Sequence, residues 1–161
     1  MQIMAKEINL VGDVATVKKD RLRFVKNKIS STLCYVAILF NVLYFANIYS
    51  TNHDFYYTFD IGMSVVYNLL FLLFTFLCSE GVKNYSKGYS IFVFIIGIMQ
   101  IVRIYGIPMK AHKDPTIMGN DQFNLLITYL LVSAACCIAA GVIGFIKTMV
   151  LENYKKETGL C

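Results

Sequence analysis

Four long apolar runs, each with few polar positions, dominate the pattern of the chain. They cover residues 29–49, 59–78, 90–107 and 123–146. Each run is close to the ~20 residues that an α-helix needs to cross ~30 Å of hydrocarbon. Helices buried inside a large soluble protein would show the same long apolar runs. A chain of 161 residues, however, has too little sequence left to cover four such helices. We therefore predict an all-α protein built as a four-span transmembrane bundle.

The connections between the runs are short, so each span should return beside the one before it. This arrangement gives an up-down-up-down bundle. Composition divides the chain into a basic juxtamembrane arm at residues 1–28, the bundle at 29–147 and a tail at 148–161. Met1 and Met4 both remain open as the natural start.

Polar residues within the runs recur at steps of three and four, which is the spacing of one helix face. Asn41 lies near the middle of the first run, Asn68 lies in the second, and Gln100 and Arg103 lie in the third. At ~1.5 Å per residue, these side chains and Ser133 of the fourth run reach a similar depth. We expect a polar layer in which Asn41 and Asn68 hydrogen-bond across the first two spans.

Arg103 is the most demanding of these residues, because it places a charge inside a span. An arginine at the centre of a membrane helix costs at least ~2.5 kcal/mol on insertion scales, so its side chain should face protein, water or the interface. Asp60 begins the second span at the outer edge, where a guanidinium reaching upward from Arg103 could meet it. The candidate ligand-binding residues are therefore Arg103, Gln100, Asn68, Asn41 and Asp60.

Lysine and arginine are distributed unevenly around the runs. Of the 15 basic residues, twelve lie in the arm, in the connection after the second run and after the end of the fourth run, whereas the connection after the third run has only Lys110 and Lys113. Basic residues accumulate in the cytoplasmic flanks of membrane proteins. We therefore expect a multi-pass protein of the cell membrane with both termini in the cytoplasm.

The basic arm has Asp13 as a helix cap, followed by apolar positions at helical spacing. We expect an amphipathic segment at the membrane surface, where each basic residue contributes about 1 kcal/mol of attraction to anionic inner-leaflet lipids. The same charges also act as a topology signal, and the pattern fits both roles. The candidate residues for binding lipid headgroups are Lys18, Lys19, Arg21, Arg23, Lys26 and Lys28.

Residues typical of catalysis are sparse in the runs, which contain no histidine and no paired acids. His53, Asp54, His112, Asp114 and Asp121 fall in the outer connections, but their spacing follows no metal-ligand pattern. The five cysteines form no CxxC pair, and no glycine-rich phosphate loop or basic patch with interleaved aromatics is present. We predict a protein that is not an enzyme and has no metal, no cofactor and no nucleic-acid partner.

The fourth run matches the small-xxx-small packing pattern at Ala135–Ala139 and at Ala140–Gly144. Packing inside the bundle and pairing with a second copy of the chain both fit this pattern.

Two functions remain open from the sequence, of which we prefer the first. The first is a membrane protein that acts by association, as an accessory subunit or a small scaffold, with a protein partner or a second copy. The second is a small carrier or receptor that binds an anionic or lipid-like ligand in an outward-facing polar layer around Arg103. The charge in the layer favours an anionic ligand, whereas the amides and the serine around it are also ordinary interhelical hydrogen-bonding groups.

Overall fold

The structure is a computed structural model that describes residue 17 and residues 25–49, 58–113 and 118–157. Of residues 58–61, 107 and 111, only the backbone is described. The described part of the chain is helical and contains no strand, which confirms the all-α prediction. Its elements are α2 (Lys28–Tyr49), α3 (Thr58–Lys83), α4 (Lys87–Val102), η2 (Arg103–Tyr105), α5 (Ile107–His112) and α6 (Asn120–Glu157).

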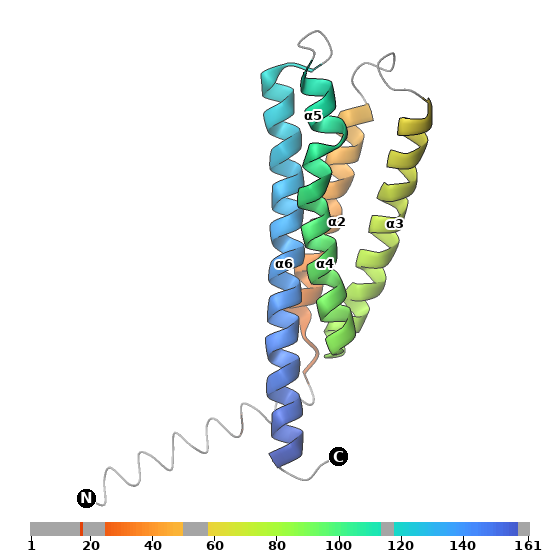
Figure 1. Cartoon of the computed structure of the whole chain (residues 1–161). Coiled ribbons are helices and arrows are strands. Elements are labelled where there is room, and N and C mark those ends of the chain that lie inside the picture. The colour runs from red at the N-terminus through yellow and green to blue at the C-terminus, as the bar shows by residue number, and fades with distance from the viewer. Residues whose placement is uncertain (1–16, 18–24, 50–57, 114–117, 158–161) are drawn as a thin grey trace, which may run out of the picture.

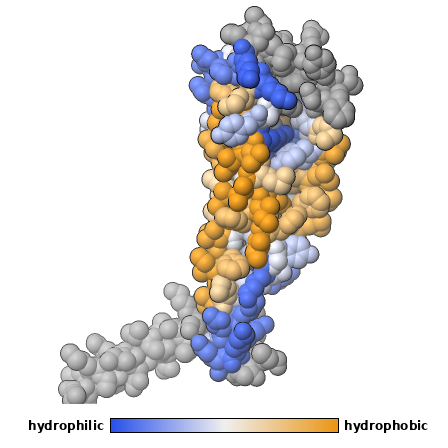
Figure 2. All heavy atoms as spheres, viewed as in Figure 1, coloured by the Kyte–Doolittle hydropathy of each residue, from blue (hydrophilic) through white to orange (hydrophobic). Residues whose placement is uncertain are grey.

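Four segments of the described chain are long and apolar enough to cross a membrane. They are Lys28–Tyr49, Gly62–Lys83, Lys87–Lys110 and Asn120–Glu157. Figure 2 shows hydrophobic side chains over the middle of the visible face and hydrophilic ones toward its two ends. The protein is therefore an all-helical chain with four candidate spans, as the apolar runs predict.

The four long helices lie side by side, and α6 extends along the whole length of the molecule (Figure 1). Helix α6 packs most extensively against α4 and α2, whereas α3 packs mainly on α2 and α4 and scarcely touches α6. Small residues explain this arrangement, because they allow two helix backbones to approach closely. The small buried residues of α6 are Ser133, Ala134, Cys137, Ala140, Gly141 and Gly144.

Two glycines mark the closest approach of α4 and α6. A Cβ atom added to Gly97 would lie 2.7 Å from the side chain of Ile138 and 3.2 Å from the carbonyl oxygen of Ala134. A Cβ atom added to Gly141 would lie 2.9 Å from the carbonyl oxygen of Ser90. The contact between these helices therefore depends on glycine at both positions.

The two small-residue motifs of the fourth span have different surroundings. Ala140 and Gly144 are buried within the chain itself, so this pair packs inside the molecule. Ala135 is exposed and Ala139 is only half-buried. Of the two motifs, the Ala140–Gly144 pair is therefore unavailable to a second copy of the chain.

The third span is not one continuous helix, which differs from the uninterrupted run expected at residues 90–107. Helix α4 ends at Val102, a turn of 3₁₀-helix covers Arg103–Tyr105, and α5 begins at Ile107. Pro108 accounts for the break, because a proline lacks the N–H needed for an α-helical hydrogen bond, and its ring clashes with the carbonyl group four residues earlier. Arg103 therefore lies where the helix changes form.

Helix α6 is longer than the run that predicts it, since it continues through Glu157 without interruption. Its 38 residues correspond to about 57 Å at 1.5 Å per residue, well beyond the ~30 Å of a hydrocarbon core. In Figure 1 its C-terminal end projects past the other helices. Lys147 and Glu152 join this extension to the rest of the molecule through a hydrogen bond to Asn27 and an ion pair with Lys87.

The basic arm is described only at its end. Lys18, Lys19, Arg21 and Arg23 lie outside the described residues, so their predicted contact with lipid headgroups stays a prediction. Lys26 and Lys28 are exposed, and Lys28 begins α2.

The chain just before α2 is hydrogen-bonded to the turn between α3 and α4. The backbone N–H of Asn27 donates to the carbonyl oxygen of Lys83 over 3.0 Å, and the hydroxyl of Tyr85 donates to the carbonyl oxygen of Val25 over 2.8 Å. Burial raises the pKa of the Tyr85 phenol, so the hydroxyl keeps the proton that it donates.

Candidate functional site: a buried polar cluster around Arg103

Asn41 of α2 is the centre of a hydrogen-bonded cluster between the long helices. Its Nδ2 donates to Oδ1 of Asn68 on α3 over 3.2 Å. Its Oδ1 accepts two hydrogen bonds of 3.0 Å, one from Nε2 of Gln100 and one from Nη1 of Arg103. Asn41, Asn68 and Gln100 are all buried. A single amide therefore links α2, α3, α4 and the start of η2.

The fourth span enters the same cluster through Ser133 of α6. Its hydroxyl donates to the carbonyl oxygen of Ala37 over 3.0 Å and lies 3.4 Å from Nε2 of Gln100. Asn68 also donates to the carbonyl oxygen of Ser64 one turn earlier. The predicted hydrogen bond between Asn41 and Asn68 is therefore confirmed, and so is the convergence of polar side chains from all four spans.

The guanidinium of Arg103 lies between two aromatic rings. Its Cζ atom is 4.5 Å from the ring centroid of Tyr44 on α2 and 4.7 Å from that of Tyr67 on α3. A cation over an aromatic face gains ~0.5–1 kcal/mol at an exposed site and ~2 kcal/mol or more when desolvated. Arg103 is also the first residue after α4, where the negative end of the helix dipole favours a cation.

Two atoms at the centre of the cluster have no hydrogen-bond partner. They are Nη2 of Arg103 and Oε1 of Gln100, and both are shielded from solvent. No carboxylate among the residues whose side chains are described pairs with Arg103. The guanidinium thus interacts with one amide oxygen, with the side chains of Tyr44 and Tyr67 and with a helix end, while its Nη2 atom has no hydrogen bond.

The predicted partner of Arg103, Asp60, belongs to α3. Its side chain falls outside the description, so the pairing of Asp60 with Arg103 stays a prediction.

The candidate metal ligands of the two connections that we expect on the outer side form no metal site where they are described. His112 stacks on Phe123 of α6, with ring centroids 3.9 Å apart and an interplanar angle of 4°. Asp121 is exposed in the first turn of α6. Among the described residues, no group of three or more His, Cys, Asp or Glu side chains could hold a metal ion. His53, Asp54 and Asp114 lie outside the description.

Sequence reasoning missed the role of Tyr44 and Tyr67. Tyr44 follows Asn41 by three residues and so lies on the same helix face, but this spacing does not show that Arg103 stacks on its ring.

A second polar group at the opposite end of the molecule was also missed. Ser31 and Ser79 hydrogen-bond over 2.8 Å between α2 and α3. Asn27 donates to Ser30 over 2.8 Å and accepts from Lys147 over 3.0 Å. These residues lie at the ends of the apolar runs. Polar side chains are expected there on any membrane helix, so their presence does not indicate a specific contact.

No protein-family model, curated protein or solved structure matches this chain.

Proposed function

We propose that the chain is a cell-membrane protein whose spans run up-down-up-down with both termini in the cytoplasm. The lysines support this orientation. The start of α2, the turn between α3 and α4, and the end of α6 carry most of them, whereas Lys110 and Lys113 follow the third span. Such a bias toward one side is the usual mark of the cytoplasmic face. The lysine-rich end would then contact the anionic lipids of the inner leaflet.

We further propose that this protein is not an enzyme and that it binds a small anionic or lipid-like ligand at Arg103, as a receptor or carrier. One observation carries the proposal: Nη2 of Arg103 is buried without a hydrogen-bond partner while the guanidinium lies between Tyr44 and Tyr67. Burying a charge costs several kcal/mol unless a partner compensates for it. An anionic group beside Nη2 would supply that compensation through a charge-assisted hydrogen bond.

The broken third span supports the same function. Non-helical backbone at membrane depth is tolerated where it lies within protein or lines a cavity, and broken helices commonly mark the binding sites of transporters. Here the break begins at Arg103, and Gly106 and Pro108 follow it within the span. The break leaves the guanidinium at the C-terminal end of α4 and not in mid-helix.

The ligand can be tested with single-chain amphiphiles that differ only in their head. The melting temperature (Tm) of the purified protein in detergent is measured with octyl phosphate, octanoate and neutral octanol. A ligand at ~100 times its Kd stabilises by about 2.7 kcal/mol, or roughly 5–10 °C for a chain of this size. We expect the two anions, and not octanol, to raise the Tm of the wild type.

Two charge-removing variants complete this test. Arg103→Gln should reduce the rise, whereas Lys110→Gln, which removes an exposed charge beyond the break, should retain it in full. An equal response of Arg103→Gln and the wild type would contradict ligand binding at Arg103.

The C-terminal half of α6 favours a second candidate function, association as an accessory subunit or a scaffold. This helix projects past its neighbours and exposes Met149 and Val150 beside a basic end. A chain that ends at residue 148, before both exposed residues, distinguishes the two functions. If the protein acts by association, this truncation should release a partner chain or dissociate a homo-oligomer on a native mass spectrum. It should leave the response to octyl phosphate unchanged.

A further inference from the structure

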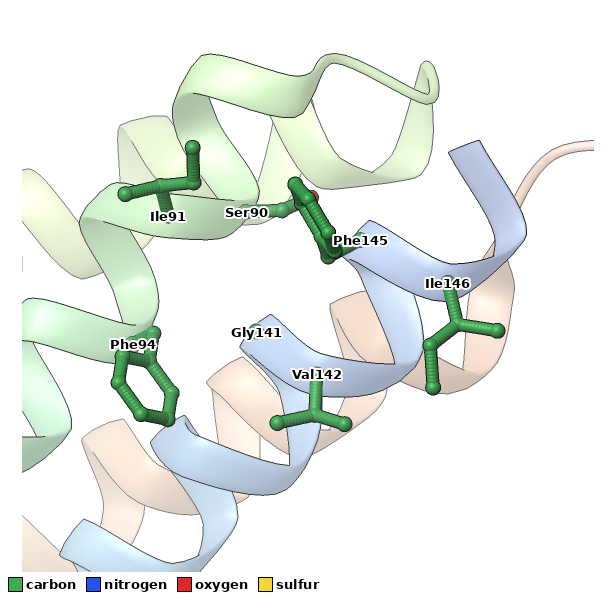
Figure 3. Close-up of a pocket in the computed structure, with 7 residues that line it drawn as sticks. All are labelled: Ser90, Ile91, Phe94, Gly141, Val142, Phe145 and Ile146. Atoms are coloured by element: carbon green, nitrogen blue, oxygen red, sulfur yellow. The ribbon is translucent and has the colours of Figure 1, made fainter. Parts of the chain in front are cut away.

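The surface between α4 and α6 contains an apolar slot away from the Arg103 cluster. Its volume is about 280 Å³, and Ser90, Ile91 and Phe94 of α4 face Gly141, Val142, Phe145 and Ile146 of α6 across it. Figure 3 shows the side chains of these residues arranged around Gly141. A Cβ atom added to Gly141 would lie 2.9 Å from the Cβ atom of Phe94 and from the carbonyl oxygen of Ser90, so the two helices touch at this glycine and the slot lies between the side chains that flank it.

The lining of the slot is almost entirely hydrocarbon. Its only hydroxyl group, on Ser90, donates to the carbonyl oxygen of Ser86 over 3.1 Å and is already paired. Ile91, Val142 and Ile146 are exposed on the helix surface. Because these residues belong to two candidate spans, the slot opens toward the acyl chains of the bilayer.

A charged pair lies just beyond one end of the slot, on the same two helix faces. Lys87 precedes Ser90 and Ile91 by three and four residues, and Glu152 follows Phe145 by seven, so each lies in register with the slot residues of its own helix. Their side chains form an ion pair and remain 42% and 40% exposed. A basic group is thus accessible at the point where the apolar slot ends.

We propose that the slot holds one acyl chain of an anionic phospholipid whose phosphate binds Lys87. The positive charge of Lys87 favours this ligand. Lys87 belongs to the lysine-rich end of the molecule, and a phosphate would pair with its ammonium group beside or in place of Glu152. This lipid site is independent of the ligand proposed at Arg103.

The headgroup preference can be measured by native mass spectrometry of the full chain in detergent. Phosphatidylglycerol and phosphatidylcholine with identical acyl chains are added in equal amounts. One basic residue near an anionic headgroup contributes about 1 kcal/mol, so the wild type should retain about fivefold more of the anionic lipid. Equal retention of the two lipids would overturn the proposal.

Two variants of the ion pair separate lipid binding from a purely structural role. Lys87→Gln should abolish the preference for phosphatidylglycerol, whereas Glu152→Gln should keep or strengthen it, because Lys87 then has no competing carboxylate. Both variants break the same ion pair. If they lower the preference equally, the ion pair only holds α4 to α6 and the phosphate does not bind Lys87.

A third variant tests the slot itself. Val142→Trp places a large ring at its mouth and should reduce retention of both lipids, whereas Leu131→Trp, at an exposed site on α6 away from the slot, should not. Both positions face outward, and an unchanged unfolding transition confirms that the variants fold. Lipid retention by Val142→Trp at the wild-type level would contradict the proposal. A dimer that only Val142→Trp dissociates would also contradict it, by assigning the slot to a second copy.

Discussion

The ammonium group of Lys147 donates a hydrogen bond to Oδ1 of Asn27 over 3.0 Å, across 120 residues of sequence. Asn27 is almost fully buried, and its backbone N–H and side-chain amide donate to Lys83 and Ser30. This one residue therefore joins the start of α2 to the end of α3 and to α6.

The Asn27 junction leads to the first prediction. Lys147→Met leaves a buried oxygen of Asn27 unpaired, which costs about 1–3 kcal/mol. We expect this loss in the free energy of unfolding, measured by denaturant titration in detergent micelles. Lys156→Met removes a lysine from the exposed end of the same helix and should be neutral. Equal effects of the two substitutions would mean that net charge matters and the hydrogen bond to Asn27 does not.

The second prediction concerns the unequal roles of Asn41 and Asn68. Asn41→Ala should destabilise more than Asn68→Ala, because it deprives both Gln100 and Arg103 of their shared acceptor. A double-mutant cycle should give a coupling of about 0.6 kcal/mol, and at most ~1.7, which is the range for interhelical hydrogen bonds in membranes. Additive losses in the cycle would show that the bond between the two amides contributes nothing to stability.

The third prediction uses glycines in contrasting surroundings. Gly97→Ala should destabilise, since the new methyl group would press on Ile138 and on the backbone of α6. Gly62→Ala should stabilise by about 0.5–1 kcal/mol, the usual gain in a helix interior, because nothing lies within 4 Å of its added Cβ. When the unfolding of the two variants is measured under the same conditions, the changes in the free energy of unfolding should have opposite signs. A loss of stability at both positions would contradict the distinction.

The fourth prediction is the ion pair between Arg103 and Asp60. If the two side chains meet, Arg103→Leu and Asp60→Leu should each cost on the order of 3–5 kcal/mol, and the double substitution should recover part of that loss. The free energies of unfolding of the two singles and the double measure the coupling. Purely additive losses would show that Arg103 and Asp60 do not interact. The partner of the guanidinium would then be another anion.

The fifth prediction tests the orientation in the membrane. Single cysteines replace His53 or Asn84 in a chain that carries Cys161→Ser, and intact cells are treated with a membrane-impermeant maleimide. Position 53 should be labelled from outside and position 84 only after lysis, because the lysine-rich end is expected in the cytoplasm. The reverse pattern would invert the topology.

Helix faces were the most predictable part of this fold. The residues of α2 that share a helix face with the predicted layer residue Asn41 are all buried, namely Cys34, Ala37, Tyr44 and Ile48. This success has a physical reason. In a chain surrounded by lipid, polar and small residues gather where helices meet, and their spacing reveals the face without knowledge of the neighbouring helix.

The break in the third span was less predictable. The apolar pattern continues through Ile104 and Ile107, and hydrophobicity does not distinguish an α-helix from one turn of 3₁₀-helix. Pro108 was the available signal, but it stood at the expected end of the span, where a proline is unremarkable.

The stacking of Arg103 between Tyr44 and Tyr67 could not be derived either. A cation–π contact depends on the rotation of two helices relative to each other, which periodicity along each helix does not specify. A different limit hid the contact between Lys147 and Asn27, because the sequence does not show how far α6 continues as a helix beyond its apolar run.

The partners of Arg103 also have a consequence for synthesis of the protein. Asn41, Tyr44 and Tyr67 all precede Arg103 in the sequence, so they leave the ribosome before it does. A nascent third span therefore meets an acceptor and two aromatic rings that have already been inserted, and its charge need not enter the bilayer unaccompanied. Ser133 arrives last and joins a cluster that is already assembled. The residues of the cluster therefore follow one another along the chain in an order that provides partners for Arg103 before it is synthesised.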